Sequence, residues 1–246
     1  MERCDFLPVS AEEMHERGWW WYDALVVGGD AYVDHPSFGT AVISRVLEAE
    51  GLRVAVLAQP DWHDAEAFRA MGRPRLGVFI GAGNLDSMVA HYTAAKRRRS
   101  EDFYSPGKRS GCRPDRAAIV YCNRAREAFG PDMPMILGSL EASLRRFAHY
   151  DYWDDSVRRA ILFDAPADLL VYGMGEAATI EIAHRLKKKQ SVRTMTDIPG
   201  TGYITRDPSV CKFDHITLPS FEDVRDDKRL YAEATRTEYA EHDPIR

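Results

Sequence analysis

Runs of apolar residues alternate along the chain with segments that repeat apolar residues at helical spacing. The runs show little polar alternation, as expected for strands that are covered on both faces of a sheet. The helical segments between them supply the crossovers that parallel strands need. We predict strands at residues 24–28, 53–60, 76–81, 134–138 and 168–173.

This order of elements predicts an α/β fold with a doubly wound, mostly parallel sheet, arranged as a Rossmann-like three-layer sandwich. We expect a lead-in helix in residues 1–22, the α/β domain in residues 23–205, and a charged C-terminal extension or linker in residues 206–246. Residues 96–116 break the pattern with eight Lys or Arg against three acids, which indicates an exposed excursion.

The composition of the chain argues against some classes of binding partner and indicates the state of its cysteines. The formal net charge of −5 and the pI near 5.9 give no global attraction to nucleic acid or to an anionic membrane. Four irregularly spaced cysteines and the lack of a long apolar run favour reduced thiols in a cytoplasmic protein. RNA contact through the basic excursion stays open as a local alternative.

Glycine-containing polar loops follow strands one, three, four and five, and all of these loops should lie at the carboxyl edge of the sheet, where such folds bind ligands. We predict that they converge on one ligand or substrate site. The candidate residues are Asp30, Tyr32, Asp34, His35, Ser37, Asn84, Asp86, Ser87, Glu141, Arg145, Arg146, His149, Asp151 and Glu176.

Each loop also has a purely structural interpretation. Asp30, Asp34 and His35 could contact a ligand, hold a metal, or cap and shape the turn before the next helix. Residues 84–87 stand at a helix start, where capping and anion binding are both consistent with the sequence. Glu141 and Arg145 have the spacing of a helix-surface ion pair, and Arg145 could instead hold an anion.

The chain contains no Gly-x-Ser-x-Gly elbow, P-loop or His-Glu-x-x-His motif, so the sequence gives little support for an independent hydrolase. The segment "GMGEAA" at residues 173–178 fits a Gly-x-Gly-x-x-Ala pattern, but it follows the fifth strand, whereas a dinucleotide fingerprint belongs after the first.

Long segments resemble the N-terminal region of the YgiQ family of radical SAM proteins, over residues 6 to about 246. The segments that carry the resemblance include "GDAYVDHPSFGTAVISRVLEAEG", "AGNLDSMVAHYTA" and "ILGSLEASLRRFAHYDYWDDSVRRAIL". In "ILGSLEAS" the family more often has a second glycine where Ser139 stands.

The resemblance implies a radical SAM core in cis, with a [4Fe–4S] cluster on a Cys-x3-Cys-x2-Cys loop and S-adenosylmethionine as cofactor. That loop is missing from this chain, so we expect an N-terminal piece without a catalytic or metal-binding residue of its own. Whether the chain is itself an enzyme stays open.

The resemblance also implies a fold like that of cobalamin-binding domains. Histidine-ligated cobalamin uses Asp-x-His-x-x-Gly after the first strand, whereas this chain has Asp34 and His35 adjacent and Gly39 four residues further on. The pattern is not met, and cobalamin bound without that histidine is an unsupported alternative.

The sequence leads to the hypothesis of a substrate-binding or core-docking domain of a radical SAM enzyme of undefined reaction. Asp30, Asp34 and His35 would position a small-molecule or macromolecular substrate, and Arg145 or Arg146 would hold an anionic group. The alternative is a stand-alone binding module for a corrinoid, a nucleotide or RNA, although the overall charge disfavours nucleic acid.

Overall fold

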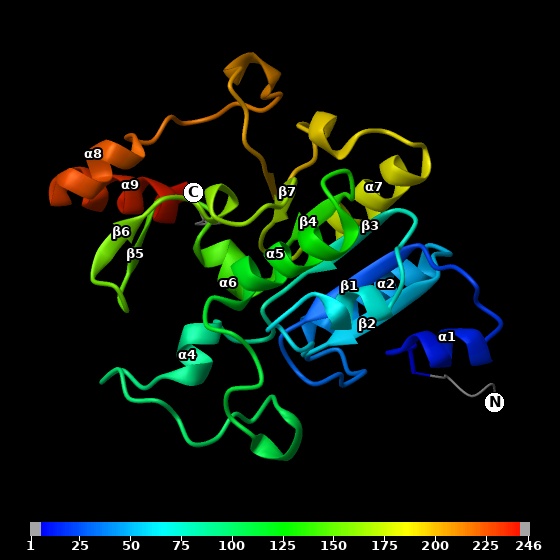
Figure 1. Cartoon of the computed structure of the whole chain (residues 1–246). Helices are drawn as coiled ribbons and strands as arrows, with labels where there is room; N and C mark the ends of the chain where they lie inside the picture. Colours follow the sequence, from blue (N-terminus) through cyan, green and yellow to red (C-terminus); the bar gives the residue numbers. More distant parts are fainter. Residues whose placement is uncertain (1–5, 242–246) are drawn as a thin grey trace.

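The predicted strands form one mixed sheet in the computed structural model, which describes residues 6–241 (Figure 1). The strand order is β2-β1-β3-β4-β7-β8. Neighbouring strands are parallel except at the last pair, where β8 runs antiparallel to β7. The strands are β1 (Ala24–Gly28), β2 (Val54–Ala58), β3 (Gly77–Ile80), β4 (Met135–Leu137), β7 (Leu169–Val171) and β8 (Thr201–Gly202).

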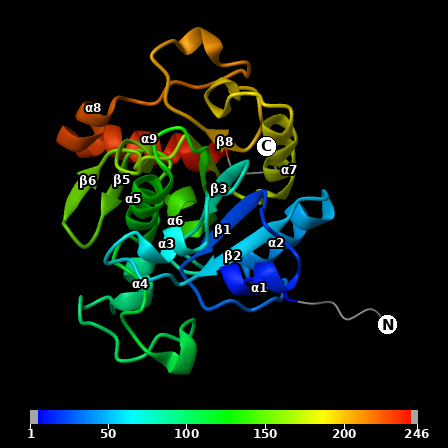
Figure 2. The same ribbon diagram turned by 45° about the vertical axis from the view of Figure 1, so that its right-hand side comes forward.

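Helices cover both faces of this sheet, which confirms the predicted doubly wound α/β fold (Figure 2). The pair α2 and α7 packs on one face, and α3 and α5 pack on the other. The α-helices are α1 (Ala11–Glu16), α2 (Gly39–Ala49), α3 (Glu66–Ala70), α4 (Ser87–His91), α5 (Ala117–Phe129), α6 (Ser139–Leu144), α7 (Glu176–Lys187), α8 (Phe221–Asp226) and α9 (Lys228–Glu241). Short 3-10 helices span Pro106–Lys108, Ile161–Phe163, Val192–Thr194 and Pro208–Val210.

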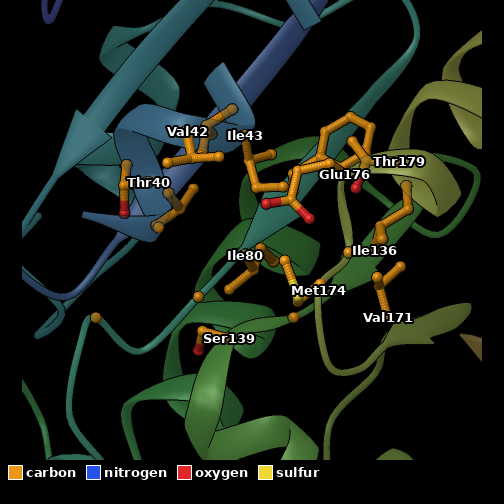
Figure 3. Close-up of a pocket in the computed structure, with 18 of the residues that line it drawn as sticks. Thr40, Val42, Ile43, Ile80, Ile136, Ser139, Val171, Met174, Glu176 and Thr179 are labelled. Atoms are coloured by element: carbon orange, nitrogen blue, oxygen red, sulfur yellow. The ribbon is translucent and has the colours of Figure 1, made fainter. Parts of the chain in front are cut away.

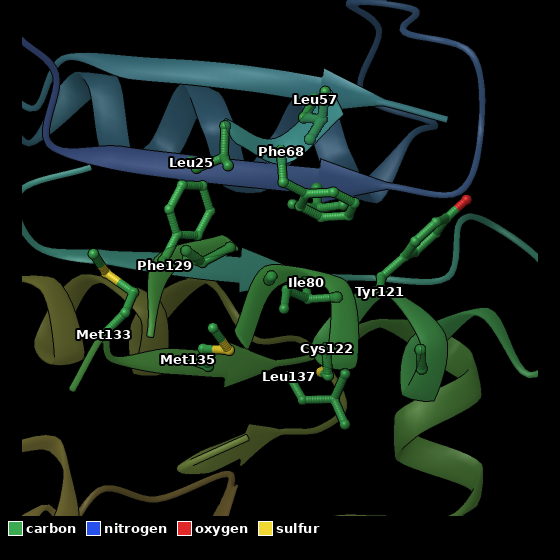
Figure 4. Close-up of a cluster of buried hydrophobic side chains, with 14 of the residues drawn as sticks. Leu25, Leu57, Phe68, Ile80, Tyr121, Cys122, Phe129, Met133, Met135 and Leu137 are labelled. Carbon is green, nitrogen blue, oxygen red and sulfur yellow. The ribbon is translucent and has the colours of Figure 1, made fainter. Parts of the chain in front are cut away.

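Two apolar layers form because successive side chains of a strand point to opposite faces. In β1, Leu25 and Val27 join the layer beneath α3 and α5, and Val26 joins the layer beneath α2 and α7. Figure 4 shows the first of these layers, where Phe68 and Phe129 fill the space beside the strands. All five residues of β1 are buried, as the unbroken apolar run predicted.

Two regions differ from the sequence-based prediction. The helix expected after the third strand ends at His91, because Tyr92 takes an extended conformation and leads into the excursion. The segment after α6 forms an antiparallel hairpin of β5 (His149–Asp151) and β6 (Ser156–Arg158), which the sequence analysis did not predict. Its strands are short and charged, so they lack the apolar pattern that reveals a buried strand.

The basic excursion is exposed at its tip and anchored at its base. Most of residues 94–101 are exposed, as predicted, but Asp102, Ser105 and Arg113 are buried. Arg113 is 0% exposed and donates to Asp102 Oδ2 at 2.8 Å, while its Nη1 lies 2.8 Å from Asp30 Oδ1. The excursion is therefore attached to the loop that follows β1.

The C-terminal helices α8 and α9 lie beside the hairpin (Figure 1). The Tyr231 hydroxyl accepts a hydrogen bond from the Tyr150 backbone at 3.0 Å, and Glu238 forms an ion pair with Arg146. The predicted extension thus packs back on the segment after α6, and the three-part division of the chain stays a prediction.

Within residues 6–241 no helix is long and apolar enough to cross a membrane. Cys112, Cys122 and Cys211 are free thiols in the same range, and Cys4 lies outside the described residues. Burial raises the pKa of the Cys122 thiol to about 12, so this cysteine packs as an apolar side chain beneath α5.

The buried Arg113 cluster generates a stability prediction. Substituting Arg113→Met leaves the Asp30 and Asp102 carboxylates buried without their cation, and we expect the free energy of unfolding to fall by about 3–5 kcal/mol. Urea denaturation measures this loss. Arg97→Met, at an exposed position of the same excursion, should change stability by less than about 0.5 kcal/mol. Equal stability of the two variants would contradict the assignment.

Candidate functional site

The loops at the carboxyl edge of the sheet are joined by direct hydrogen bonds. The Asn84 N–H, after β3, donates to Asp30 Oδ2, after β1, at 2.7 Å. The Ala82 N–H donates to Ser139 Oγ at 3.0 Å, which links the loop after β3 to the start of α6. These contacts confirm that the loops after β1, β3 and β4 meet at one rim.

The first loop is held by its own neighbours. The Asp34 carboxylate accepts from Arg45 Nε at 3.1 Å, and His35 Nδ1 accepts from the Ser37 N–H at 3.1 Å. Helix α2 begins after Phe38 without a side-chain cap, so the interpretation of an aspartate as its cap is wrong. Instead, the Gly39 N–H donates to Asn84 Oδ1 at 3.3 Å.

Of the remaining first-loop candidates, Asp30 belongs to the buried Arg113 cluster and Tyr32 packs against the layer beneath α2. Burial raises the pKa of Asp30, and the Arg113 charge opposes that rise. The Tyr32 hydroxyl is buried without a partner among the described residues. Asp30 is thus a structural carboxylate that fixes the loop from which the other candidates extend.

The third loop caps its helix, as the sequence indicated. Asp86 Oδ1 accepts from the Met88 N–H at 2.9 Å and from the Val89 N–H at 3.3 Å. The other Asp86 oxygen forms an ion pair with Arg145. The expected ion pair of the Arg145 guanidinium with the Glu141 carboxylate is replaced by this contact.

Glu141 is fully buried and accepts two backbone hydrogen bonds. The donors are the Ser87 N–H at 2.8 Å and the Ala118 N–H at 3.0 Å, so the carboxylate joins the starts of α4 and α5. Burial raises the pKa of Glu141, and the charge of Asp86 acts in the same direction. Its role visible in the structure is to hold the rim together.

Three further candidates lie in or just before the hairpin, and Arg146 also lies over the ring of Tyr172, directly after β7. Arg146 donates to the Ser143 carbonyl at 2.5 Å and contacts Glu238 of α9. The His149 ring nitrogen lies 3.1 Å from the Phe147 carbonyl, and burial lowers its pKa. Asp151 binds Arg116 at 2.8 Å. A ligand-binding role for these three stays a prediction.

An apolar cavity of about 330 Å³ opens at the rim, between α2 and α7 (Figure 3). Val26, Phe79, Ile136 and Val171 form its floor from four neighbouring strands, and Ile43 of α2 forms a wall. Loops after β1, β3, β4 and β7 all contribute to its lining, as the predicted convergence requires. Of the fourteen candidates, Glu176 alone is among the residues that line it.

Glu176 is the first residue of α7 and is half-buried. Figure 3 shows its carboxylate directed from α7 into the space between Ile43 and Met174. No hydrogen bond or ion pair to Glu176 is found within residues 6–241. The cavity therefore presents one carboxylate in mostly apolar surroundings.

Glycines serve two different purposes around this rim. A methyl group at Gly29 would overlap the Ala82 carbonyl, and one at Gly83 would overlap the Asp30 carboxylate, so both are required for loop packing. At Gly39, no atom of the described residues lies within 4 Å of the position that a Cβ would take. Its φ is not in the left-handed region, so the backbone conformation is open to other residues. Gly138 is similar, since a methyl group there would meet only Val171 O, at 3.7 Å.

Ser139 sits at the floor of the cavity in a strained conformation. Its φ is +71°, a left-handed value that costs a side-chain-bearing residue about 1–2 kcal/mol. Glycine adopts this conformation freely, so a glycine would fit this position without strain. The Ser139 hydroxyl compensates by accepting the Ala82 N–H.

Several residues that shape the site carry no local signal in the sequence. Arg113 was read as part of a solvated basic run, and no local pattern distinguishes a buried arginine there. Gly39, Gly138 and Met174 lie in segments that the sequence marked as loops or compared with a motif, but none of the three was among the candidate site residues. For Gly138, its position directly after a buried strand was a usable signal.

The chain is similar in sequence to known proteins over its whole length. A family model described as the radical SAM N-terminal domain matches residues 6–246. The chain is 54% identical to a UPF0313 protein of Clostridium botulinum (strain 657 / Type Ba4) and 51% identical to one of Clostridium perfringens (strain SM101 / Type A), in both cases over all 246 residues. It spans 38% and 37% of the length of these relatives.

The fold is also similar to part of a solved structure, the radical S-adenosylmethionine methyltransferase TsrM from Kitasatospora setae with cobalamin and a [4Fe–4S] cluster bound. The sequences are 20% identical, the TM-score is 0.45, and the match covers 74% of this chain and 27% of that chain.

The raised pKa of Glu141 generates a pH prediction. Because the folded chain holds this proton more tightly than the unfolded chain, the carboxyl favours folding below its unfolded pKa of about 4.3. This contribution is lost as pH rises through the folded pKa. The stability of the wild type relative to Glu141→Gln should therefore fall as the pH rises above the unfolded pKa of about 4.3. Urea unfolding at several pH values measures it, and a difference independent of pH would contradict it.

The strained Ser139 gives a second test at the rim. Ser139→Ala removes the acceptor of the Ala82 N–H and keeps the strain, so unfolding should need about 1–3 kcal/mol less. Ser139→Gly loses the same hydrogen bond but relieves the left-handed strain. Its free energy of unfolding should therefore be at least about 1 kcal/mol higher than that of the alanine variant. Paired urea titrations compare the two, and a glycine variant less stable than the alanine variant would refute the account.

Proposed function

Because the chain belongs to the radical SAM N-terminal family, we propose that it is the substrate-binding and core-docking domain of a longer radical SAM protein. The relatives are much longer than this chain, which leaves room for a radical SAM core in cis. The carboxyl edge of the sheet would face that core. Closing the edge would exclude water from a reactive intermediate.

The observation that carries this proposal is the exposure of large apolar side chains after β4 and β7, on α6 and at Met174. Met174, at the mouth, is 91% exposed, and Leu144 of α6 is 59% exposed. Leu140 and Phe147, before and after Leu144, are also exposed. Clusters of exposed large apolar side chains usually mark an interaction surface. A core domain of the same polypeptide would cover them.

The family implies a [4Fe–4S] cluster and S-adenosylmethionine for the whole protein. Within residues 6–241 no group of three His, Cys, Asp or Glu side chains could hold a metal ion. The cysteines that the structure describes, Cys112, Cys122 and Cys211, come from separate segments, and Cys122 is fully buried. The described residues do not fit a cluster, and the proposal assigns its ligands to the core.

The candidate residues take different parts in this proposal. Asp30, Asp86, Glu141 and Arg145 would hold the rim in shape, because their charged groups already contact one another or the backbone. Asp34, His35, Ser37 and Asn84 would lie at the interface and adjust on docking. Glu176 would contact the substrate, because it lines the cavity. The reaction itself stays undefined.

Charge substitutions on the apolar surface test the docking. In the full-length protein, Leu144→Glu with Met174→Glu should expose the interface and raise amide hydrogen exchange in residues 139–147 and 173–176 by on the order of tenfold or more. The same pair in the isolated 246-residue chain should change the free energy of unfolding by less than about 0.5 kcal/mol, since both side chains are exposed.

Trp20→Glu is the matched control. Trp20 is 80% exposed and lies before β1, at the amino edge of the sheet. In the full-length protein this substitution should leave the exchange of the two segments unchanged. If the double variant behaved like Trp20→Glu, the carboxyl edge would not be the docking face.

A further inference from the structure

Cationic side chains are missing from the lining of the cavity, among the residues that the structure describes. Its floor and walls are aliphatic or aromatic side chains and exposed backbone, and its polar side chains are Thr40, Ser139, Thr179 and Glu176. Neither lysine nor arginine nor histidine lines it, among the residues that the structure describes. A phosphate or carboxylate placed inside would meet the Glu176 carboxylate and no cationic side chain. Only backbone N–H groups at the starts of α2, α6 and α7 could pair it, and the nearby carboxylate would repel it.

Open glycines give the cavity its shape. Gly39 at the start of α2 and Gly138 after β4 both lack a conformational or packing reason to be glycine, and both face this space. Their missing side chains leave room for a ligand that lies directly against the backbone. Such close approach suits a flat group, and a volume near 330 Å³ is at the small end of ligand sites.

The Glu176 carboxylate determines which hydrogen-bonding groups a ligand in the cavity should present. An ionised carboxylate only accepts hydrogen bonds, and its two oxygens match two parallel N–H donors. Figure 3 shows the Glu176 side chain directed into the cavity, and the described residues supply no donor to it.

We infer that the cavity binds a flat, uncharged heteroaromatic ring with two adjacent N–H donors on one edge, of the 2-amino-4-oxopyrimidine type found in guanine. The ring lies between Gly39 and Gly138, and its ring N–H and exocyclic amine donate to Glu176. Apolar contact with Ile43 and Ile136 supplies the rest of the binding energy. The inference rests on the proposed function in taking this cavity as the ligand site.

Isothermal titration of the 246-residue chain with three nucleosides tests the inference. Guanosine offers both donors and should bind; inosine lacks the exocyclic amine and should bind at least about tenfold more weakly. Adenosine presents a ring acceptor in place of the ring N–H and should bind more weakly than inosine. Equal affinity for the three nucleosides, or no binding of guanosine, overturns the inference.

Variants connect the binding to the named residues. Glu176→Gln replaces one acceptor by a donor, so it should weaken guanosine at least about tenfold and reduce its advantage over inosine. Glu233→Gln, exposed on α9, is the matched control and should leave all affinities unchanged. A parallel loss for every nucleoside in Glu176→Gln would indicate a structural effect and would overturn the role of the carboxylate.

Filling the open glycines tests the shape. Gly39→Ala and Gly138→Ala add a methyl group to two residues that line the cavity without backbone strain, so guanosine binding should fall at least about tenfold while the urea midpoint stays unchanged or rises slightly. Retained guanosine affinity in both variants would exclude this cavity as the site. These titrations require no core domain, and the docking test requires no nucleoside, so either hypothesis can fail alone.

Discussion

The position of one buried guanidinium determines the arrangement of the carboxyl edge. Arg113 is fully buried between Asp30 and Asp102, and its Nη1 also donates to the Ala82 carbonyl at 3.3 Å. A buried ion pair is often close to neutral in net stability, because desolvation of the charges offsets their attraction. Its consequence here is geometric: three segments distant in the sequence must meet where the charges are paired.

The carboxyl ends of the strands therefore have different surroundings on the two faces of the sheet. On the side of α5, the strand ends carry buried charges and a carboxylate that accepts backbone hydrogen bonds, so this side is rigid and already satisfied. On the side of α2 and α7, the same strand ends surround an apolar cavity with open glycines. The Glu176 carboxylate in this cavity has no hydrogen-bond or ion-pair partner within residues 6–241. The polar network fixes the loops, and the apolar side remains available for a ligand.

Docking and ligand binding would use adjacent parts of one edge. Met174 lies at the mouth of the cavity, and the exposed apolar residues of α6 follow directly after β4. A partner that covered this surface would also close the cavity. Such an arrangement would couple occupancy of the cavity to contact between the domains, since each would bury apolar surface next to the other.

Periodicity in the sequence was enough to determine the fold class, the five parallel strands and the convergence of their loops, because buried strands need unbroken apolar runs and parallel strands share one carboxyl edge. Local patterns also identified the Asp86 cap. Pairing between distant charges was decided only by the tertiary structure: nothing near Arg113 distinguishes it from the exposed arginines of the same run. The left-handed Ser139, the hairpin and the open glycines likewise depend on contacts from other segments, which a linear pattern does not encode.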